Sequence, residues 1–303
     1  MSEPTAAVYP NRGIRTRGRE ESRTPGGKSG GRAQALALRG AVYAAAGFTF
    51  FILIFLIGYI LVRGIPYLTP DLFSLEYTSD NCSMMPAIVT TLKMTGLSLL
   101  IAIPISVFTA VYLVEYAKRG NKLVKVVRLT AETLSGIPSI VYGLFGYLMF
   151  VIALNMDKSM LAGALTLAIM ILPTILRTTE EALKAVPDSF REGSFGLGAG
   201  RLRTMLCVVL PAAVPGILSG VILAVGRIVG ETAALMYTAG TVEQIAGMMD
   251  SGITLSVHMY RQASEGLYTE QAYATAVVLL ALVLLINLLA GRLAASVTKG
   301  RQA

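Results

Sequence analysis

The chain has 303 residues, of which 54% are hydrophobic and only 15% are charged, and its mean hydropathy is +0.64. Soluble domains carry about 25% charged residues, so this composition excludes the ordinary soluble class and predicts an integral membrane protein in contact with lipid. The formal net charge of +8 is a weak argument for nucleic-acid binding, because basic residues also act as topology signals in membrane proteins.

Apolar windows long enough to cross about 30 Å of hydrocarbon recur along the chain. These windows lack the period-two alternation of barrel strands, which excludes a transmembrane β-barrel. We therefore predict an all-α integral membrane fold with six transmembrane helices, near residues 41–62, 88–114, 129–154, 160–176, 214–239 and 272–291.

Lysine and arginine fall on one alternate set of connections. They gather in the first 39 residues, between 118 and 128, between 177 and 203, and after residue 291, whereas the connection from 64 to 83 carries only acidic charges. By the positive-inside rule, both termini and the segment 180–211 are expected in the cytoplasm.

Four parts follow from this topology. Residues 1–39 are rich in Arg, Gly, Ser and Pro and are predicted to be a disordered basic cytoplasmic tail. Residues 40–83 hold the first helix and an external loop, residues 84–292 form a core of five helices, and residues 293–303 form a second cytoplasmic tail. Cys82 and Cys207 are expected on opposite sides of the membrane, where they cannot pair.

The third window contains a proline and several glycines within a short distance. Gly136 and Pro138 loosen the backbone, and Gly143 and Gly146 allow close helix contact. Freed backbone groups at membrane depth are tolerated only against protein or a water-lined cavity. The window therefore indicates either a kinked, tightly packed helix or a helix that faces a transport pathway.

A charged pair lies at the inner end of the fourth window. Arg177 and Glu180 are three residues apart, and a positive group at this position would attract an anion inward. The pair is equally explained as an interfacial feature with no transport role.

The segment 180–211 is polar, basic and rich in glycine, and it cannot lie in lipid. We predict a helix-turn-helix on the cytoplasmic surface. Its first helix would run from about Thr179 to Gly193 with a break at Pro187, its turn would use Gly196, Gly198 and Gly200, and its second, basic helix would end near Leu210 and Pro211. The alternative is a solvated amphipathic loop with no partner.

The fifth window carries Arg227 and Glu231, whose spacing of four places them on one face of a helix. An arginine well inside the hydrocarbon must face a bundle interior, a partner helix or water. A guanidinium fork suits an oxyanion such as phosphate, so the pair predicts a pathway site. The alternative is a structural ion pair that holds two helices together.

His258 is the only histidine of the chain. Because a metal site needs several clustered ligands, we predict that it is a loop or packing residue and that the chain holds no metal.

The cytoplasmic segment has a specific resemblance. The segment 192–211 resembles the EAA loop of ABC-importer permeases, whose pattern is EAA, three residues, G, nine residues and I-x-L-P. In this chain the corresponding residues are Glu192-Gly193-Ser194, then three residues, Gly198, nine residues and Val208-x-Leu210-Pro211. Gly193 and Ser194 replace the two alanines, and Val208 replaces isoleucine, so the spacing is kept while three side chains differ. The resemblance implies that Glu192, Gly193, Ser194, Gly198, Leu210 and Pro211 form the coupling site for an ATPase subunit.

The region from about residue 84 to 292 is similar to phosphate-specific ABC permease subunits, the PstA type more than its PstC-type partner. The stretches that carry this similarity are MPAIV from Met85, SGIPSIVYG from Ser135, LP-x-x-x-RTTEEA from Leu172, GR-x-x-GET from Gly226 and TLSVHMY from Thr254. The similarity implies the MetI-like architecture of type I importers, with an EAA coupling helix. It also implies that Arg177, Glu180, Arg227 and Glu231 are the charged residues that matter for passage.

The same resemblance implies the setting of the protein. The partners would be a second, PstC-type permease chain, two ATP-binding subunits and a periplasmic phosphate-binding protein, in a bacterial inner membrane. The chain has no GxxxxGK[ST] loop, so ATP and Mg²⁺ are expected on partner subunits, and the chain itself is expected to be a transport subunit rather than an enzyme.

Other interpretations remain open at this point. The chain could be the PstC-type partner or a permease for another oxyanion, since substrate choice in such systems resides mostly on the binding protein. A proton-coupled secondary transporter would also carry intramembrane charges, but its EAA-like loop would have no purpose. A membrane-embedded enzyme is disfavoured, because no nucleophile and base pair or metal cluster occurs among the helices.

Overall fold

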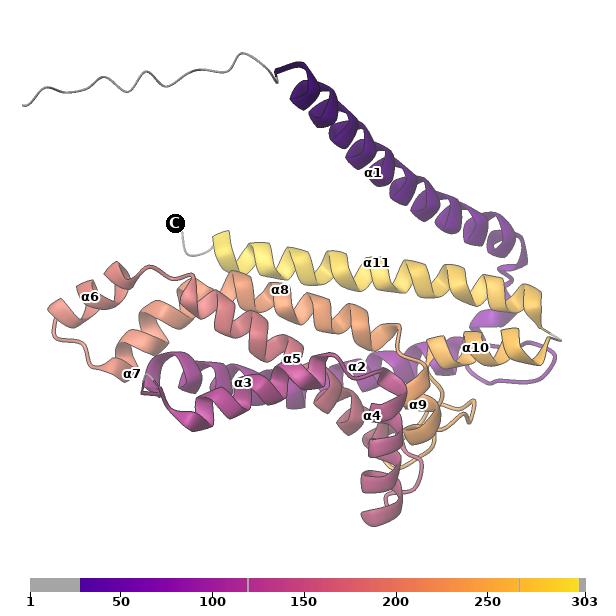
Figure 1. The fold of residues 1–303 in the computed structure, drawn as a ribbon. Coiled ribbons are helices and arrows are strands. Elements are labelled where there is room, and N and C mark those ends of the chain that lie inside the picture. The colour runs from indigo at the N-terminus through magenta and orange to yellow at the C-terminus, as the bar shows by residue number, and fades with distance from the viewer. Residues whose placement is uncertain (1–27, 119, 267, 300–303) are drawn as a thin grey trace, which may run out of the picture. The chain divides into compact units, whose positions relative to one another are not determined.

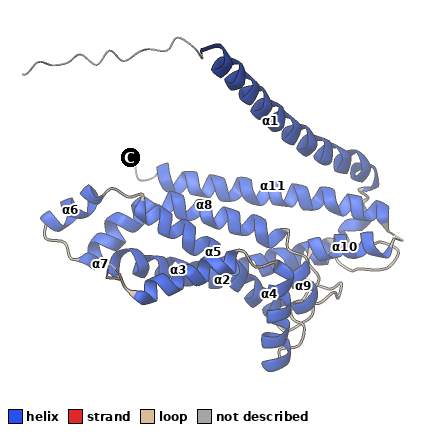
Figure 2. Cartoon of the chain, viewed as in Figure 1, coloured by secondary structure: helices blue, strands red, loops and turns tan. Residues whose placement is uncertain are grey.

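The computed structural model describes residues 28–118, 120–266 and 268–299. Every regular element in these residues is helical (Figure 2). The chain divides into two compact units, Met1–Leu56 and Ile57–Ala303. The described residues of the first unit, 28–56, belong to helix α1, and the second unit contains the bundle.

Five helical segments are long and apolar enough to cross a membrane: Gln34–Tyr67, Met85–Tyr116, Met160–Lys184, Arg201–Val229 and Thr269–Arg292. A sixth is present if the bent pair Lys122–Ser135 and Ser139–Ala153 is one span. The prediction of an all-helical membrane fold is therefore confirmed, with five of the six predicted spans found as long helices and the third corresponding to the bent pair.

The helices and shorter elements have these bounds: α1 Lys28–Gly64, η1 Ile65–Tyr67, η2 Pro70–Phe73, α2 Met85–Val111, η3 Tyr112–Tyr116, α3 Lys122–Ser135, α4 Ser139–Gly146, η4 Tyr147–Ala153, α5 Met160–Lys184, α6 Asp188–Gly196, α7 Arg201–Thr204, η5 Met205–Val209, α8 Leu210–Val229, α9 Ala233–Thr238, α10 Leu255–Glu265 and α11 Thr269–Lys299. Of the η elements, η3, η4 and η5 are π-helical continuations of neighbouring helices.

The predicted tail boundaries do not coincide with the helix ends. Helix α1 begins at Lys28, so residues 28–39 are helical rather than irregular, and α11 extends the last span to Lys299. Alanine and leucine dominate residues 34–38, and these residues favour helix once a neighbouring apolar helix has nucleated. Residues 1–27, which hold most of the predicted tail, and residues 300–303 lie outside the described residues.

Helix α5 is the central element of the bundle (Figure 1). In its most apolar stretch 67% of the residues are buried, against 17–28% in α2, α8 and α11. It packs against α2, α8 and α3, and Leu167, Ile171 and Ile175 are fully enclosed. The other helices expose wide apolar faces, which in a membrane contact lipid or another subunit.

Two hydroxyl groups fasten α2 to α5 within the apolar core. Ser98 Oγ donates to the carbonyl of Ala164 at 3.0 Å, and Ser106 Oγ donates to the carbonyl of Leu172 at 3.1 Å. Serine side chains are small, so the backbones of α2 and α5 can approach each other, and both hydroxyl groups still have a hydrogen-bond acceptor.

The third predicted span is bent by 107° between α3 and α4. Gly136 follows the last residue of α3, and Pro138 precedes α4 with an extended backbone. Proline has no N–H and disfavours helix in the residue before it. The Tyr142 hydroxyl donates to the carbonyl of Leu134 at 2.8 Å, and the amide of Ile137 donates to the same carbonyl at 3.1 Å, so α4 is tied back to the end of α3. The prediction of a kinked helix is confirmed, and its pathway role stays a prediction.

The two glycines of α4 permit close packing, as predicted. A Cβ atom at Gly143 would lie 2.6 Å from the backbone Cα of Ala234 in α9, and one at Gly146 would overlap Thr166 of α5 and Thr238 of α9. Helix α4 therefore contacts α9 backbone to backbone.

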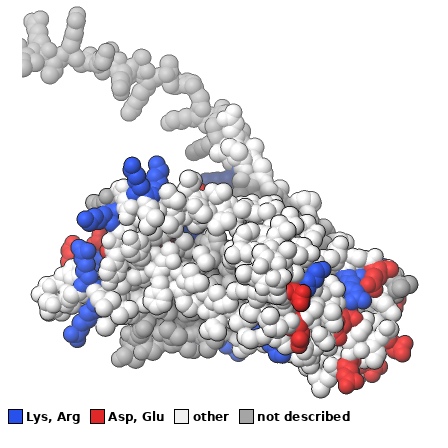
Figure 3. Space-filling model, turned by 90° about the horizontal axis from the view of Figure 1, so that it is seen from below, with Lys and Arg blue, Asp and Glu red and all other residues white. Residues whose placement is uncertain are grey.

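Charge divides the bundle into two ends. The α6 end, which carries α6 and α7, gathers most Lys and Arg side chains, whereas most Asp and Glu side chains lie at the α10 end, which carries α9 and α10 (Figures 1 and 3). The two cysteines are free: Cys82 is buried in the loop before α2, and Cys207 is exposed in η5. The sidedness of these ends stays a prediction, and the charge asymmetry is the one that the positive-inside rule requires.

The close contact of α4 with α9 is testable through Gly143. We expect Gly143→Ala to lower the free energy of unfolding by about 1–3 kcal/mol, because a helix backbone cannot yield as a side chain can. The measurement is the unfolding midpoint of the purified protein in mild detergent. Gly96→Ala in α2 is the matched control, since its added Cβ would meet nothing within 4 Å. Equal midpoints for the two variants would contradict the backbone contact.

Candidate functional site

The segment between α5 and α8 forms a small helical hairpin at the α6 end of the bundle (Figure 1). The predicted break at Pro187 is confirmed, but the two parts belong to different helices: residues 179–184 complete α5, and residues 188–196 form the separate helix α6. Pro187 explains the separation, since it cannot donate to a preceding carbonyl and its ring clashes with the turn before it. Helix α6 therefore starts anew at Asp188 and can be oriented independently of α5.

The second helix of the predicted pair does not end near Leu210 and Pro211. Helix α7 runs through the π-helical turn η5 into α8, so residues 201–229 form one continuous helical segment. Pro211 lies in the first turn of α8, directly after a π-helical turn whose wider spacing accommodates the missing donor. Leu210 and Pro211 thus join the hairpin to a membrane span.

Helix α6 has no buried residue, although it carries several large apolar side chains. Phe190 is 53% exposed, Phe195 45% and Leu197 90%. Glu192 and Gly193 are exposed beside them. An apolar surface on a short polar helix outside the core is typical of a protein interaction site.

Ser194 and Gly198 shape the hairpin. Ser194 Oγ and Thr204 Oγ1 lie 2.8 Å apart and link α6 to α7. Gly198 has φ +82° and its amide donates to the carbonyl of Phe195 at 2.9 Å. This left-handed conformation is accessible mainly to glycine. Gly193 has no such constraint, and an added Cβ there would meet nothing within 4 Å.

Arg191 is a residue that the sequence analysis did not assign to the site. Its guanidinium donates to Glu115 of η3 at 2.8 and 3.0 Å and to the carbonyl groups of Leu183 and Val186. It also pairs with Asp188 of its own helix. Residues 115 and 191 are 76 positions apart in the chain, so no local spacing signals their contact.

The predicted pair of Arg177 with Glu180 does not form. Arg177 pairs with Glu181 at 3.3 Å on the exposed side of α5. Glu180 is buried on a different side and contacts Arg128 of α3 at 2.5 Å and Lys184 at 2.6 Å. Three residues turn a helix by about 300°, and this offset directs Glu180 toward α3 while Arg177 remains outside. Glu180 therefore joins α5 to α3.

The predicted shared helix face of Arg227 and Glu231 is also wrong. Helix α8 ends at Val229, and Glu231 precedes α9, where its carboxylate accepts the amide of Ala234 at 3.1 Å. The carbonyl of Glu231 accepts from Ser256 of α10 at 2.6 Å. Glu231 thus fixes the junction of α8, α9 and α10 and makes no ion pair with Arg227 among the described residues.

Arg227 lies partly buried in the last turn of α8. Within the part of the chain that the structure describes, it has no ion pair and no hydrogen bond, and its charge acts electrostatically on Tyr142 of α4. A guanidinium at the end of an apolar span is costly without a counter-charge, water or a ligand. Arg227 is therefore available to a group outside the described chain.

A cavity of about 930 Å³ opens at the α6 end between α3, η3 and the start of α6. Its lining includes the ion-paired residues Glu115, Arg128, Lys184 and Arg191, together with Lys118 of the η3–α3 connection and Lys122 and Lys125 of α3. The cavity is thus bounded by the polar contacts that join α6 and α5 to their neighbours.

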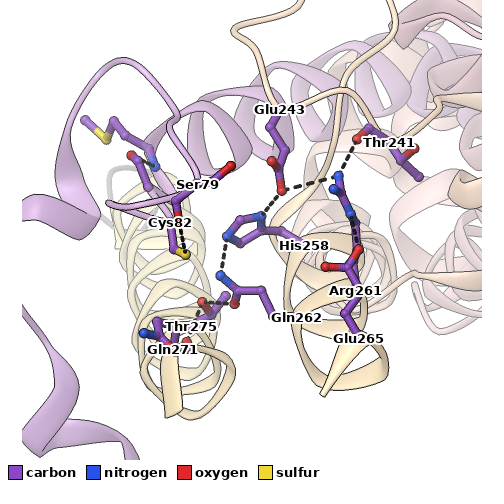
Figure 4. A network of polar contacts seen from close by, with 12 residues as sticks. Ser79, Cys82, Thr241, Glu243, His258, Arg261, Gln262, Glu265, Gln271 and Thr275 are labelled. Carbon is purple, nitrogen blue, oxygen red and sulfur yellow. Dashed lines mark hydrogen bonds and ion pairs between the residues drawn. The ribbon is translucent and has the colours of Figure 1, made fainter. Parts of the chain in front are cut away.

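At the opposite end, His258 of α10 is fully enclosed in a polar network (Figure 4). Its Nδ1 lies 3.1 Å from Glu243, and its Nε2 lies 3.0 Å from the Gln262 amide, which accepts from Thr275 of α11. Arg261 also contacts Glu243, at 3.5 Å. The network holds the segment before α10 to α10 and α11, so His258 is a packing residue as predicted.

The same network affects two neighbouring groups of the loop before α2. Burial raises the pKa of the Cys82 thiol, and the nearby Glu243 charge adds to the effect. Burial and the hydrogen bond to Glu243 raise the pKa of the Tyr77 phenol. Both groups therefore stay protonated at neutral pH. No group of three or more His, Cys, Asp or Glu residues within the described ranges is placed to hold a metal ion.

Residues 102–299 match the family model of the binding-protein-dependent transport system inner membrane component. The chain belongs to this family. It is also 34% identical over 254 residues to the phosphate transport system permease protein PstA of Pasteurella multocida, covering 82% of this chain and 90% of that protein.

Other relatives match a smaller part of their own length. The chain is 37% identical over 196 residues to the probable ABC transporter permease protein YqgI of Bacillus subtilis, spanning 62% of this chain and 65% of the relative. It is 40% identical over 154 residues to the phosphate transport system permease protein PstA 1 of Mycobacterium tuberculosis, spanning 51% of this chain and 50% of the relative. The match thus spans between half and two thirds of these two proteins.

Solved structures agree on the fold. The chain aligns with a bacterial ABC transporter involved in the import of the acidic polysaccharide alginate with a TM-score of 0.62 at 17% identity, over 88% of this chain and 99% of that one. It aligns with the inward-facing MetNI methionine ABC transporter with a TM-score of 0.56 at 22% identity, over 70% and 93%. The MetI-like, type I permease architecture that the resemblance implied is confirmed.

The turn after α6 is testable through its glycines. We expect Gly198→Ala to destabilise the turn by about 1–2 kcal/mol, because an L side chain is strained at positive φ. Gly193→Ala is the matched control, since this position is open and has no positive φ. The measurement is amide hydrogen exchange of residues 195–200, which should be faster in the first variant only. Equal exchange in both variants would contradict a turn that requires glycine.

Proposed function

We propose that this chain is a transmembrane permease subunit of an ATP-driven importer of inorganic phosphate. The observation that carries the proposal is the hairpin of α6 and α7, a surface element with exposed apolar side chains on a permease bundle of this family. The relatives named for phosphate transport support the substrate.

In this proposal α6 is the coupling helix. Its exposed Phe190 and Phe195, with Leu197 directly after the helix, dock into an ATP-binding subunit. Glu192, Gly193, Ser194 and Gly198 set the shape and charge of the contact. Leu210 and Pro211 then pass its motion into α8. The chain lacks a GxxxxGK[ST] loop, so ATP and Mg²⁺ are bound by two partner subunits.

The remaining partners follow the same scheme. A second, PstC-type permease chain covers the apolar faces that α2, α8 and α11 expose, and a periplasmic phosphate-binding protein delivers the anion at the α10 end. The α6 end and both termini are cytoplasmic, in a bacterial inner membrane. Alternating access would arise as rigid-body rocking of the bundle when the ATP-binding subunits close.

In this proposal the two arginines and the two glutamates of the pathway have different roles. Arg227, with no partner among the described residues, presents its donor fork to the anion, and Arg177, which is exposed and paired with Glu181, lies farther along. Glu231 holds the start of α9, and Glu180 joins α5 to α3. A proton-coupled carrier would give the exposed hairpin no function, whereas a permease for another oxyanion remains the nearest rival.

The coupling role of α6 predicts a separation of assembly from transport. We expect Glu192→Lys and Gly198→Asp to reduce phosphate uptake to background while the protein still inserts, because the first reverses a charge on the docking face and the second strains the turn. The measurement is labelled phosphate uptake in vesicles that contain the assembled transporter. Glu76→Lys makes the same charge change in the loop before α2 and should retain uptake. Normal uptake with wild-type assembly in either hairpin variant would refute the coupling role.

The pathway role of Arg227 predicts a loss of transport with intact assembly. We expect Arg227→Gln to lower phosphate uptake on the order of tenfold or more, as for loss of a charge-assisted contact of about 1.5–3 kcal/mol. Assembly is measured by co-purification of the partner subunits. Arg292→Gln, at the exposed end of the last span, is the control. Loss of assembly in Arg227→Gln would favour a structural role, and sulfate uptake in place of phosphate uptake by the wild type would favour the rival substrate.

A further inference from the structure

Helix α6 is held by polar contacts rather than by a hydrophobic core. It has nine residues and none of them is buried. Helices of this length are marginal by themselves, and the proline break before α6 and the glycine turn after it add no stiffness. A helix that must transmit movement therefore depends on the side chains that fasten it to its neighbours.

Arg191 makes the largest set of these attachments. Its side chain is only 14% exposed on a helix that is otherwise open to solvent. All three guanidinium nitrogens donate within the range from 2.8 to 3.2 Å, to one carboxylate on another element, to one on α6 and to two backbone carbonyl groups. A planar fork with several fixed partners has one orientation.

One attachment reaches the far end of α2. Glu115 lies in η3, the π-helical continuation of α2, and its side chain is 20% exposed. Helix α2 in turn packs along α5 through the whole bundle. The contact from Arg191 to Glu115 thus connects α6 with a membrane-spanning helix that is distant in sequence.

The other attachment spans the break between α5 and α6. The carbonyl of Leu183 belongs to the last turn of α5, and Val186 lies in the connection after it. Terminal helix carbonyls lack an intrahelical donor, and Pro187 supplies none. Arg191 donates to both carbonyls at 3.0 and 2.8 Å, so it replaces the hydrogen bonds that a continuous helix would have made.

From these contacts we infer that Arg191 is a positioning residue that locks the coupling helix to α2 and α5. Movement of α6 then displaces the two membrane helices together, and the break at residues 185–187 does not absorb it. This inference rests on the proposed transport function and adds the residue pair that transmits the movement. Asp188, whose side chain is 87% exposed, contributes little, because exposed ion pairs are weak.

The experiment measures phosphate uptake and ATP hydrolysis of the assembled transporter in proteoliposomes. We expect Arg191→Met and Glu115→Gln each to lower uptake per ATP hydrolysed on the order of tenfold, as for breaking a largely buried ion pair. The double variant should be no worse than either single variant, because both remove the same contact. Arg191→Lys, which keeps the charge but loses the fork, should recover part of the ratio, and the control Asp188→Asn should remain near wild type.

A second measurement reports directly on how firmly Arg191 holds α6 to α2. Spin labels at positions 189 of α6 and 108 of α2, both exposed and introduced after Cys207→Ser, should give a narrow distance distribution that broadens in Arg191→Met. A wild-type ratio of uptake to hydrolysis together with an unchanged narrow distribution in Arg191→Met would overturn the inference. If the wild-type transporter instead hydrolyses ATP without any phosphate uptake, the proposed substrate fails, while the distance measurement still decides the role of Arg191.

Discussion

The structure depends on the need to satisfy backbone hydrogen bonds wherever a helix is interrupted. Three interruptions each receive one polar side chain. Tyr142 donates to the carbonyl of Leu134 at the bend between α3 and α4, Glu231 accepts the amide of Ala234 at the start of α9, and Arg191 donates to two carbonyls at the end of α5. Since an unpaired backbone group away from water costs several kcal/mol, these side chains make the breaks permanent features of the fold.

The breaks are also where the functional elements lie. The break at Pro187 frees α6 to form a separate surface helix, and the break at Gly230 leaves Arg227 at the end of α8 without an intrahelical partner. In between, the buried helix α5 keeps the geometry fixed through its contacts with α2 and α8. A rigid centre with interrupted helices at both ends suits a subunit that transmits movement from one side of a membrane to the other.

Much of the architecture could be predicted from local sequence. Window length and hydropathy located the membrane helices, Pro138 and Gly136 indicated the kink, and the spacing from Glu192 to Pro211 indicated the surface hairpin. These features are local because they depend on the lipid thickness, on the missing donor of proline and on the conformational freedom of glycine. The helix ends were less accurate: Pro211 does not end a helix, because the π-helical turn before it accommodates the missing hydrogen bond.

By itself, the sequence determined the membrane class, the positions of the apolar spans and the charge asymmetry of the two ends, since each is a sum over residue types along a stretch of chain. Only the tertiary structure decided which charges meet. Spacing paired Arg177 with Glu180 and Arg227 with Glu231, yet Glu180 contacts Arg128, Glu231 accepts the amide of Ala234 in α9, and Arg191 contacts Glu115. Side-chain partners are set by the rotation of packed helices about their axes and by the positions of the breaks, and these depend on contacts between residues far apart in the chain.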